Sequence, residues 1–75
     1  MKKFEIFLKS IIQAKNFCDA IKDFDFDIEL SDGKNTANAK NVMDVLTLDL
    51  SKHITVVAHT ENSEFLDEKI KDYIV

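Results

Sequence analysis

Three stretches of the chain alternate between apolar and polar residues, at 2–8, 24–30 and 53–59. A period of two residues is typical of a strand that buries one face. The apolar series are Phe4, Ile6 and Leu8, then Phe24, Phe26, Ile28 and Leu30, and finally Ile54, Val56 and Ala58. The pattern therefore predicts three half-buried strands, of which 24–30 is the most regular.

Helical spacing replaces this alternation in three other stretches. Ser10 with Gln13 three residues later has the pattern of a capping box, so a helix is predicted from Ser10 to about residue 22. Its apolar positions are Ile11, Ala14, Phe17, Cys18 and Ile21. A short second helix is predicted to start near Lys40, and Asn62 or Ser63 is predicted to cap a third. The apolar positions of the latter two are Val42, Val45 and Leu46, and Phe65, Leu66, Ile70, Tyr73 and Ile74.

A turn at 31–34 completes the pattern, because Asp32-Gly33 between extended runs favours a hairpin. Residues 34–38 then form a short return strand at the edge of the sheet. The predicted order is β-α-β-β-α-β-α in one domain over residues 1–75. Four amphipathic strands and three helices favour an α+β fold, a four-stranded antiparallel sheet with three helices on one face.

Charge and composition narrow the classes of function. The formal net charge is −4, whereas nucleic-acid binding requires a basic stripe. Apolar runs are too short to cross a bilayer, and Glu5 interrupts the region where a signal peptide would be apolar, so we expect a cytoplasmic protein without membrane contact. Cys18 is the single cysteine and is expected to be a buried apolar residue.

Neither the histidines nor the carboxylates suggest a metal or cofactor site. His53 and His59 bracket one predicted strand and would lie roughly 20 Å apart, too far to share a metal. Asp25, Asp27 and Glu29 are expected to line the open sheet face in contact with water. We therefore expect no metal and no cofactor.

Residues 38–48, with the sequence NAKNVMDVLTL, resemble the segment N-A-K-S-I-M-G-V-M-x-L of the HPr family. These are the small phosphocarriers of the bacterial sugar phosphotransferase system. Residues 24–30 and 54–58 look like the second and last strands of the family. The resemblance implies the open-faced β-sandwich of HPr, whose order of elements is the one that the pattern predicts independently.

The resemblance also implies that the chemistry of the family has been lost. In HPr, Enzyme I phosphorylates a histidine at a helix N-terminus, and an arginine two residues later contacts the phosphoryl group. Counting back from Phe24 without gaps places the histidine at Ser10 and the arginine at Ile12. The regulatory serine of Gram-positive members falls on Asn41. A serine ester would not pass its phosphoryl group on readily, and isoleucine cannot pair with phosphate, so we expect no catalytic residue and no enzyme.

Two functions remain open at this stage. The first is a non-catalytic module for protein binding or regulation, which binds a protein partner, such as a phosphotransferase component, through the starts of its first two helices. Its candidate contact residues are Ile11, Ile12, Lys40, Val42, Met43 and Leu46. The second is a phosphocarrier or phospho-regulated protein that uses Ser10 or a displaced histidine. Phe7 and Val57, on the predicted open sheet face, suggest a homodimer contact, so we expect a monomer or a weak homodimer.

Overall fold

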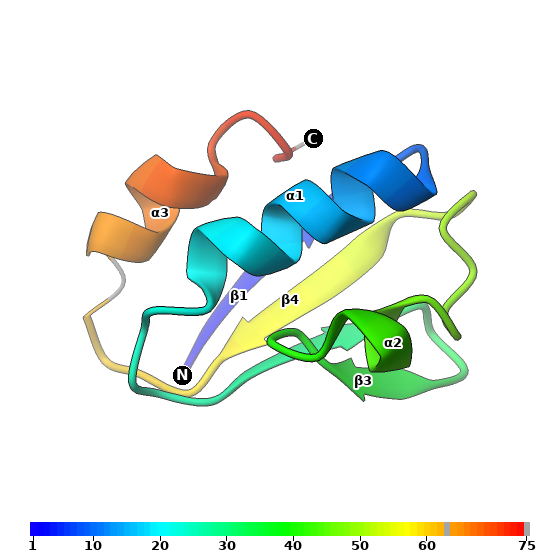
Figure 1. Cartoon of the computed structure of the whole chain (residues 1–75). Coiled ribbons are helices and arrows are strands. Elements are labelled where there is room, and N and C mark those ends of the chain that lie inside the picture. The colour runs from blue at the N-terminus through cyan, green and yellow to red at the C-terminus, as the bar shows by residue number, and fades with distance from the viewer. Residues whose placement is uncertain (63, 75) are drawn as a thin grey trace.

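The computed structural model describes residues 1–62 and 64–74. Its elements follow the predicted order (Figure 1). They are β1 (Lys2–Ile6), α1 (Ile11–Ile21), β2 (Ile28–Ser31), β3 (Thr36–Asn38), α2 (Val42–Val45), β4 (Ile54–Ala58) and α3 (Glu64–Ile70). None of the helices in the described residues is long and apolar enough to cross a membrane.

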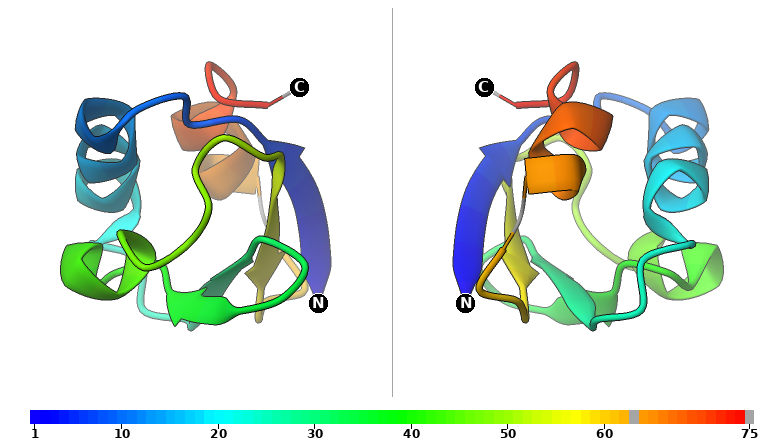
Figure 2. Two further views of the ribbon diagram at one scale, coloured as in Figure 1. Left: turned by 90° about the vertical axis from the view of Figure 1, so that its right-hand side faces the viewer. Right: turned by 90° about the vertical axis from the view of Figure 1, so that its left-hand side faces the viewer.

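The four strands form one sheet in the order β1-β4-β2-β3, and every neighbouring pair is antiparallel. The short return strand β3 lies at the edge, as predicted. The three helices lie on one side of the sheet and leave the other side open (Figure 2). The α+β fold with an open-faced sheet is therefore confirmed.

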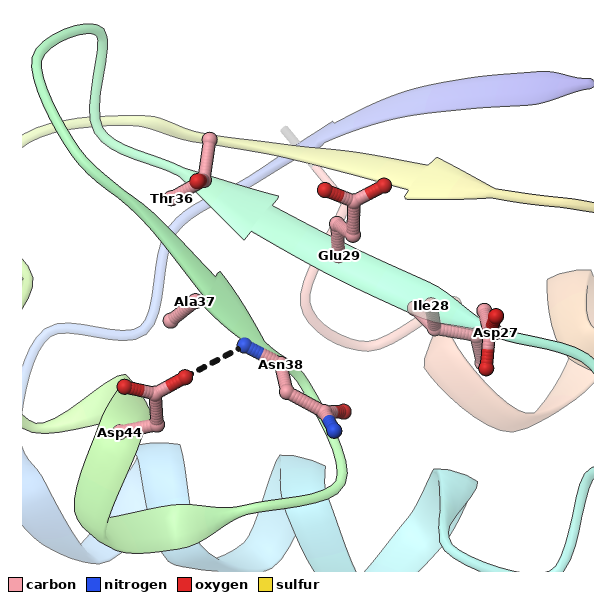
Figure 3. Close-up of a pocket in the computed structure, with 7 residues that line it drawn as sticks. All are labelled: Asp27, Ile28, Glu29, Thr36, Ala37, Asn38 and Asp44. Atoms are coloured by element: carbon pink, nitrogen blue, oxygen red, sulfur yellow. Dashed lines mark hydrogen bonds between the residues drawn. The ribbon is translucent and has the colours of Figure 1, made fainter.

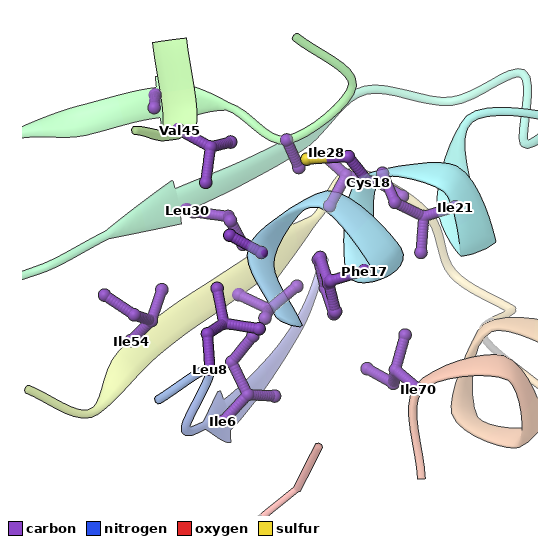
Figure 4. Packing of buried hydrophobic residues seen from close by; sticks show 14 of the residues in the cluster. Ile6, Leu8, Phe17, Cys18, Ile21, Ile28, Leu30, Val45, Ile54 and Ile70 are labelled. Carbon is purple, nitrogen blue, oxygen red and sulfur yellow. The ribbon is translucent and has the colours of Figure 1, made fainter. Parts of the chain in front are cut away.

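A single cluster of apolar side chains fills the space between the helices and the sheet (Figure 4). Its largest fully buried members are Phe17, Ile6, Leu8, Ile21, Ile28, Leu30, Ile54, Leu66, Ile70, Val45 and Val56. Alternation in the strands supplies one half of the cluster, and the buried faces of the helices supply the other. The C-terminal segment joins it, because Tyr73 packs edge-on against Phe17 with ring centroids 5.3 Å apart.

The strand predicted at 24–30 is wrong in its first half, since β2 begins only at Ile28. Ile28 pairs with Ala58, the last residue of β4, and beyond this point the ladder has no further strand pairs. Phe24 and Phe26 instead pack partly buried against the core, with their ring centroids 5.3 Å apart. Asp25 and Asp27 therefore lie in a loop rather than in a row with Glu29 on the sheet.

The other predicted strands are also shorter in the structure. The strand predicted at 2–8 ends at Ile6, although Leu8 is fully buried. His53 and His59 lie just outside β4 rather than within it. Of the two residues predicted to cap α3, Ser63 lies outside the described residues, and Asn62 Oδ1 accepts the backbone N–H of Glu64 at 3.1 Å.

Three residues predicted on buried helix faces are exposed, namely Ile11, Phe65 and Ile74. Ile74 lies beyond α3, which ends at Ile70. Ile11 is 63% exposed because it is the first residue of α1, whose buried positions begin at Ala14. Phe65 is 78% exposed. Leu66 and Ile70 take the buried face of α3, and Phe65 is rotated away from them by about 100° of helix.

Candidate functional site

The start of α1 is built around Ser10. Its backbone is extended (φ −154°, ψ 168°), and its Oγ accepts the backbone N–H of Gln13 at 3.3 Å. Ser10 is thus the helix cap that the sequence predicts. The reciprocal half of a capping box is not formed, because the N–H of Ser10 donates to the carbonyl of Leu8 at 2.7 Å.

A sharp turn at Lys9 carries the chain from the sheet into this cap. Lys9 has φ 68°, in the left-handed region that a side chain disfavours. The hydrogen bond from Ser10 to Leu8 closes a three-residue turn around it. The backbone is therefore strained immediately before the Ser10 cap, a feature that is frequent at functional sites.

Two isoleucines follow the cap and point to solvent. Ile11 is 63% exposed and Ile12 is 72% exposed, although both are large and apolar. The start of α1 therefore presents an apolar surface rather than a cationic one. The chain contains no arginine, and Ile12 stands two residues after the cap.

The start of α2 repeats this capped geometry. Asn41 has an extended backbone, and its side chain accepts the N–H of Asp44 at 3.3 Å. Met43 is 73% exposed, whereas Val42 and Leu46 are half-buried and pack against the core. Because α1 and α2 contact each other, the exposed side chains of their starts belong to one helical layer.

Lys40, the remaining candidate contact residue, is already engaged within the fold. Its Nζ donates to the backbone carbonyl of Phe24, in the loop that follows α1. The ammonium group is half-buried there and holds this loop against the start of α2. Nothing in the residue pattern indicates this contact, since the two residues are 16 positions apart.

The two histidines are not brought together. Phe7 lies beside His53, with ring centroids 5.5 Å apart, and the Nδ1 of His53 is 3.9 Å from Glu5 Oε1. At the other end of β4, the Nε2 of His59 is 2.5 Å from Glu29 Oε1. No group of three potential metal ligands occurs among residues 1–62 and 64–74.

A shallow hollow of about 360 Å³ lies beside the edge strand (Figure 3). It contains Asp27 and Glu29, two of the carboxylates that the sequence singled out, together with Asp44. The carboxylate of Asp44 accepts the backbone N–H of Asn38 at 2.9 Å, so it joins α2 to β3. This role is structural.

Cys18 is buried in α1 and is not disulfide-bonded. Burial, and to a smaller extent Asp19, raises the pKa of the thiol. A raised pKa keeps the sulfur protonated at neutral pH and therefore unreactive. This agrees with its expected role in the core.

Known proteins resemble the chain in both sequence and structure. A family model described as the phosphorylation site of the PTS HPr component matches residues 12–74. HPr-C-His from Thermoanaerobacter tengcongensis has a similar structure, with a TM-score of 0.80 and 22% identity. The match covers 99% of this chain and 91% of that protein. The histidine-containing phosphocarrier protein of Mycoplasma also has a similar structure, with a TM-score of 0.69 and 17% identity. The match covers 95% of this chain and 93% of that protein. No curated protein matches the chain in sequence.

Proposed function

The chain belongs to the HPr family of phosphocarrier proteins, and we propose that it serves as a non-catalytic member that binds a protein partner through the start of α1. The observation that carries the proposal is the surface beside the Ser10 cap. Two isoleucines are 63% and 72% exposed there. An apolar surface of this kind fits a protein partner better than a phosphoryl group.

The residue at the cap supports the same conclusion. Family members carry the phosphoryl group on a histidine at a helix N-terminus, and the residue that caps the N-terminus of α1 here is Ser10. A phosphohistidine transfers its phosphoryl group readily, whereas a serine phosphate ester is stable. Ser10 also uses its Oγ as the acceptor of the Gln13 N–H, and phosphorylation would alter this cap.

The partner surface that we propose centres on Ile11, Ile12 and Met43, the exposed apolar residues of α1 and α2. Val42 and Leu46 support it from partly buried positions, and Lys40 fixes the neighbouring loop. The partner class is a protein, with components of the phosphotransferase system as the first candidates, because family members act with these proteins.

The direct test is intact-mass analysis after incubation with Enzyme I and phosphoenolpyruvate, with an ordinary HPr as the positive control. We expect no phosphate adduct on this chain while the control is labelled. An adduct would overturn the non-catalytic assignment. Peptide mapping would then locate it at Ser10, His53 or His59.

Restoring the family residues provides a second test. The double variant Ser10→His with Ile12→Arg should acquire a phosphate adduct under the same conditions, because it supplies the acceptor and the cation at the start of α1. The matched control is Ser10→Ala with Ile12→Ala, which should remain unlabelled. A restored variant without label would count against the placement of Ser10 at the acceptor position or against the retention of the Enzyme I surface.

Binding itself is tested by titrating the isotopically labelled chain with Enzyme I and following backbone amide shifts. We expect the shifts to cluster at Ile11, Ile12 and Met43. Ile12→Glu should weaken binding by about tenfold, as expected if Ile12 is one of the few interface residues that carry most of the binding energy. Shifts confined to the open sheet face would refute this surface.

The phosphocarrier function remains the second candidate, because the family as a whole has it. His59 is the histidine that favours it, since its ring is half-exposed and its Nε2 lies against the Glu29 carboxylate. In the mass experiment, His59→Ala would then abolish the adduct.

A further inference from the structure

The most exposed large apolar side chain among the described residues lies away from the proposed partner surface. It is Phe65, in the first turn of α3, with 78% of its surface exposed. Large exposed aromatic side chains are uncommon on isolated protein surfaces and are enriched at interfaces. Neither the fold nor the proposed function gives Phe65 a role.

Phe65 borders a hollow between two helices. The lining residues come from the C-terminal part of α1, the loop after it and one face of α3, and they are Ala20, Asp23, Phe24, Phe65 and Lys69. α3 lies beside the C-terminal half of α1 (Figure 1). Because α1 rises about 1.5 Å per residue, Ala20 is roughly 12 Å along the helix from Ile12. The hollow is therefore separate from the start of α1.

The size of the hollow limits its occupant. Its volume is about 190 Å³, and its lining is mostly apolar. Pockets for small molecules are usually about 300–1,000 Å³. An apolar side chain inserted from a partner protein is therefore a better fit than a free metabolite.

The charged residues near the hollow indicate which class of partner would bind there. Residues 19–27 and 61–72 contain nine of the fourteen carboxylates of the chain but only three of its ten lysines. These two segments contribute both sides of the hollow, and they carry a formal charge of −6, against −4 for the whole chain. Asp23 is the carboxylate that lines the hollow itself, whereas Glu61, Glu64 and Asp67 line a separate hollow beside Lys2. Among the three lysines, Lys69 lines the hollow, and Lys71 donates to Glu68 Oε1 at 2.9 Å.

We propose that this α1–α3 hollow is a second docking surface, which takes a lysine- or arginine-rich segment of a partner protein with one apolar side chain inserted beside Phe65. Charge repulsion opposes the same surface of a second copy as the occupant, because two such acidic surfaces repel each other. The inference is independent of the function proposed for the start of α1.

The test uses the isotopically labelled full chain and a peptide amide in which a phenylalanine is flanked on both sides by lysines. We expect saturable amide shifts at 20–24 and 65–69. Binding should weaken steeply with salt, because screening at 0.1 M acts over about 10 Å. The same peptide with glutamates in place of the lysines should not bind.

Variants separate the hollow from non-specific attraction. Phe65→Ser should weaken binding of the lysine peptide by about tenfold, and Asp23→Lys should also weaken it and reduce the salt dependence. The matched control is Ile74→Ser, which removes an exposed apolar side chain outside both proposed surfaces and should leave binding unchanged. The proposal is overturned by the absence of saturable shifts, by shifts confined to 11–12 and 41–46, or by binding that survives Phe65→Ser.

Discussion

At the scale of single residues, short polar side chains satisfy backbone groups at the turns and at the helix starts. Asp32, in the turn between β2 and β3, is the fullest example. Its Oδ1 accepts the N–H groups of Lys34 and Asn35 at 2.9 and 2.8 Å. Its Oδ2 accepts the N–H of Asp49 at 2.9 Å and so joins the hairpin to the loop after α2.

These three backbone donors lower the pKa of Asp32 from 3.8 to about 2, because they favour the charged carboxylate. Because the pKa of Asp32 is lower in the folded state than in the unfolded state, the carboxylate stabilises the fold. This contribution is complete above the unfolded pKa, near pH 4, and it is lost as the pH falls through the folded pKa of about 2. Asp32→Asn should therefore destabilise the protein above pH 4 but progressively less toward pH 2. Urea unfolding at several pH values measures this difference.

The control for that experiment is Asp25→Asn, which changes an exposed carboxylate in the loop before β2. It should alter stability by less than about 0.5 kcal/mol, as expected for a surface substitution. A carboxyl titration that places Asp32 near its usual value of 3.8 would contradict the role of the three N–H donors.

At the scale of elements, α3 separates a structural face from an exposed one. Leu66 is fully buried, whereas Phe65 next to it is 78% exposed. Leu66→Ala should cost about 2–5 kcal/mol, because it leaves a cavity in the core. Phe65→Ser should change the free energy of unfolding by less than about 0.5 kcal/mol.

Chemical denaturation of the two variants beside the parent chain measures both effects. Equal losses would mean that Phe65 packs on the fold, and the α1–α3 hollow would then lose its proposed role. The comparison also shows that Phe65→Ser remains folded, which the peptide titration requires.

At the scale of the whole molecule, every helix and strand contributes to one core. The radius of gyration is 10.8 Å, close to the roughly 11 Å expected for a compact chain of this length. The C-terminal segment belongs to the same unit, since Phe7 N–H donates to the carbonyl of Tyr73 at 3.0 Å. No part of the described chain therefore has a core of its own.

We accordingly predict one cooperative unfolding transition, as expected if residues 1–75 form a single domain. The chain has no tryptophan and one tyrosine, so the near-UV signal of Tyr73 reports how the C-terminal segment packs on α1. Its midpoint in urea should coincide with the far-UV midpoint of the helices and strands. Two separate midpoints would refute the single-domain prediction.

The sequence alone determined the order of elements, the open-faced sheet and the cap at Ser10, because these depend on local periodicity and on side chains that bond to their own backbone. It predicted Ile11 and Ile12 as contact residues, but it also placed Ile11 among the buried positions of the helix, and that placement is wrong. The strand predicted over residues 24–27 is wrong, because alternation describes only the pattern of side chains. A strand also requires a neighbouring strand to pair with, and β4 ends at Ala58, opposite Ile28.

Only the tertiary structure decided the long-range contacts. The contact of Lys40 with the carbonyl of Phe24, the contact of Asp32 with Asp49, and the exposure of Phe65 all depend on segments that are distant in the sequence. Residue pattern fixes which face of an element is apolar, but the neighbours that cover that face are fixed by how the chain packs. For this reason the sequence was sufficient to predict a contact surface at the start of α1, whereas the α1–α3 hollow could be found only in the folded structure.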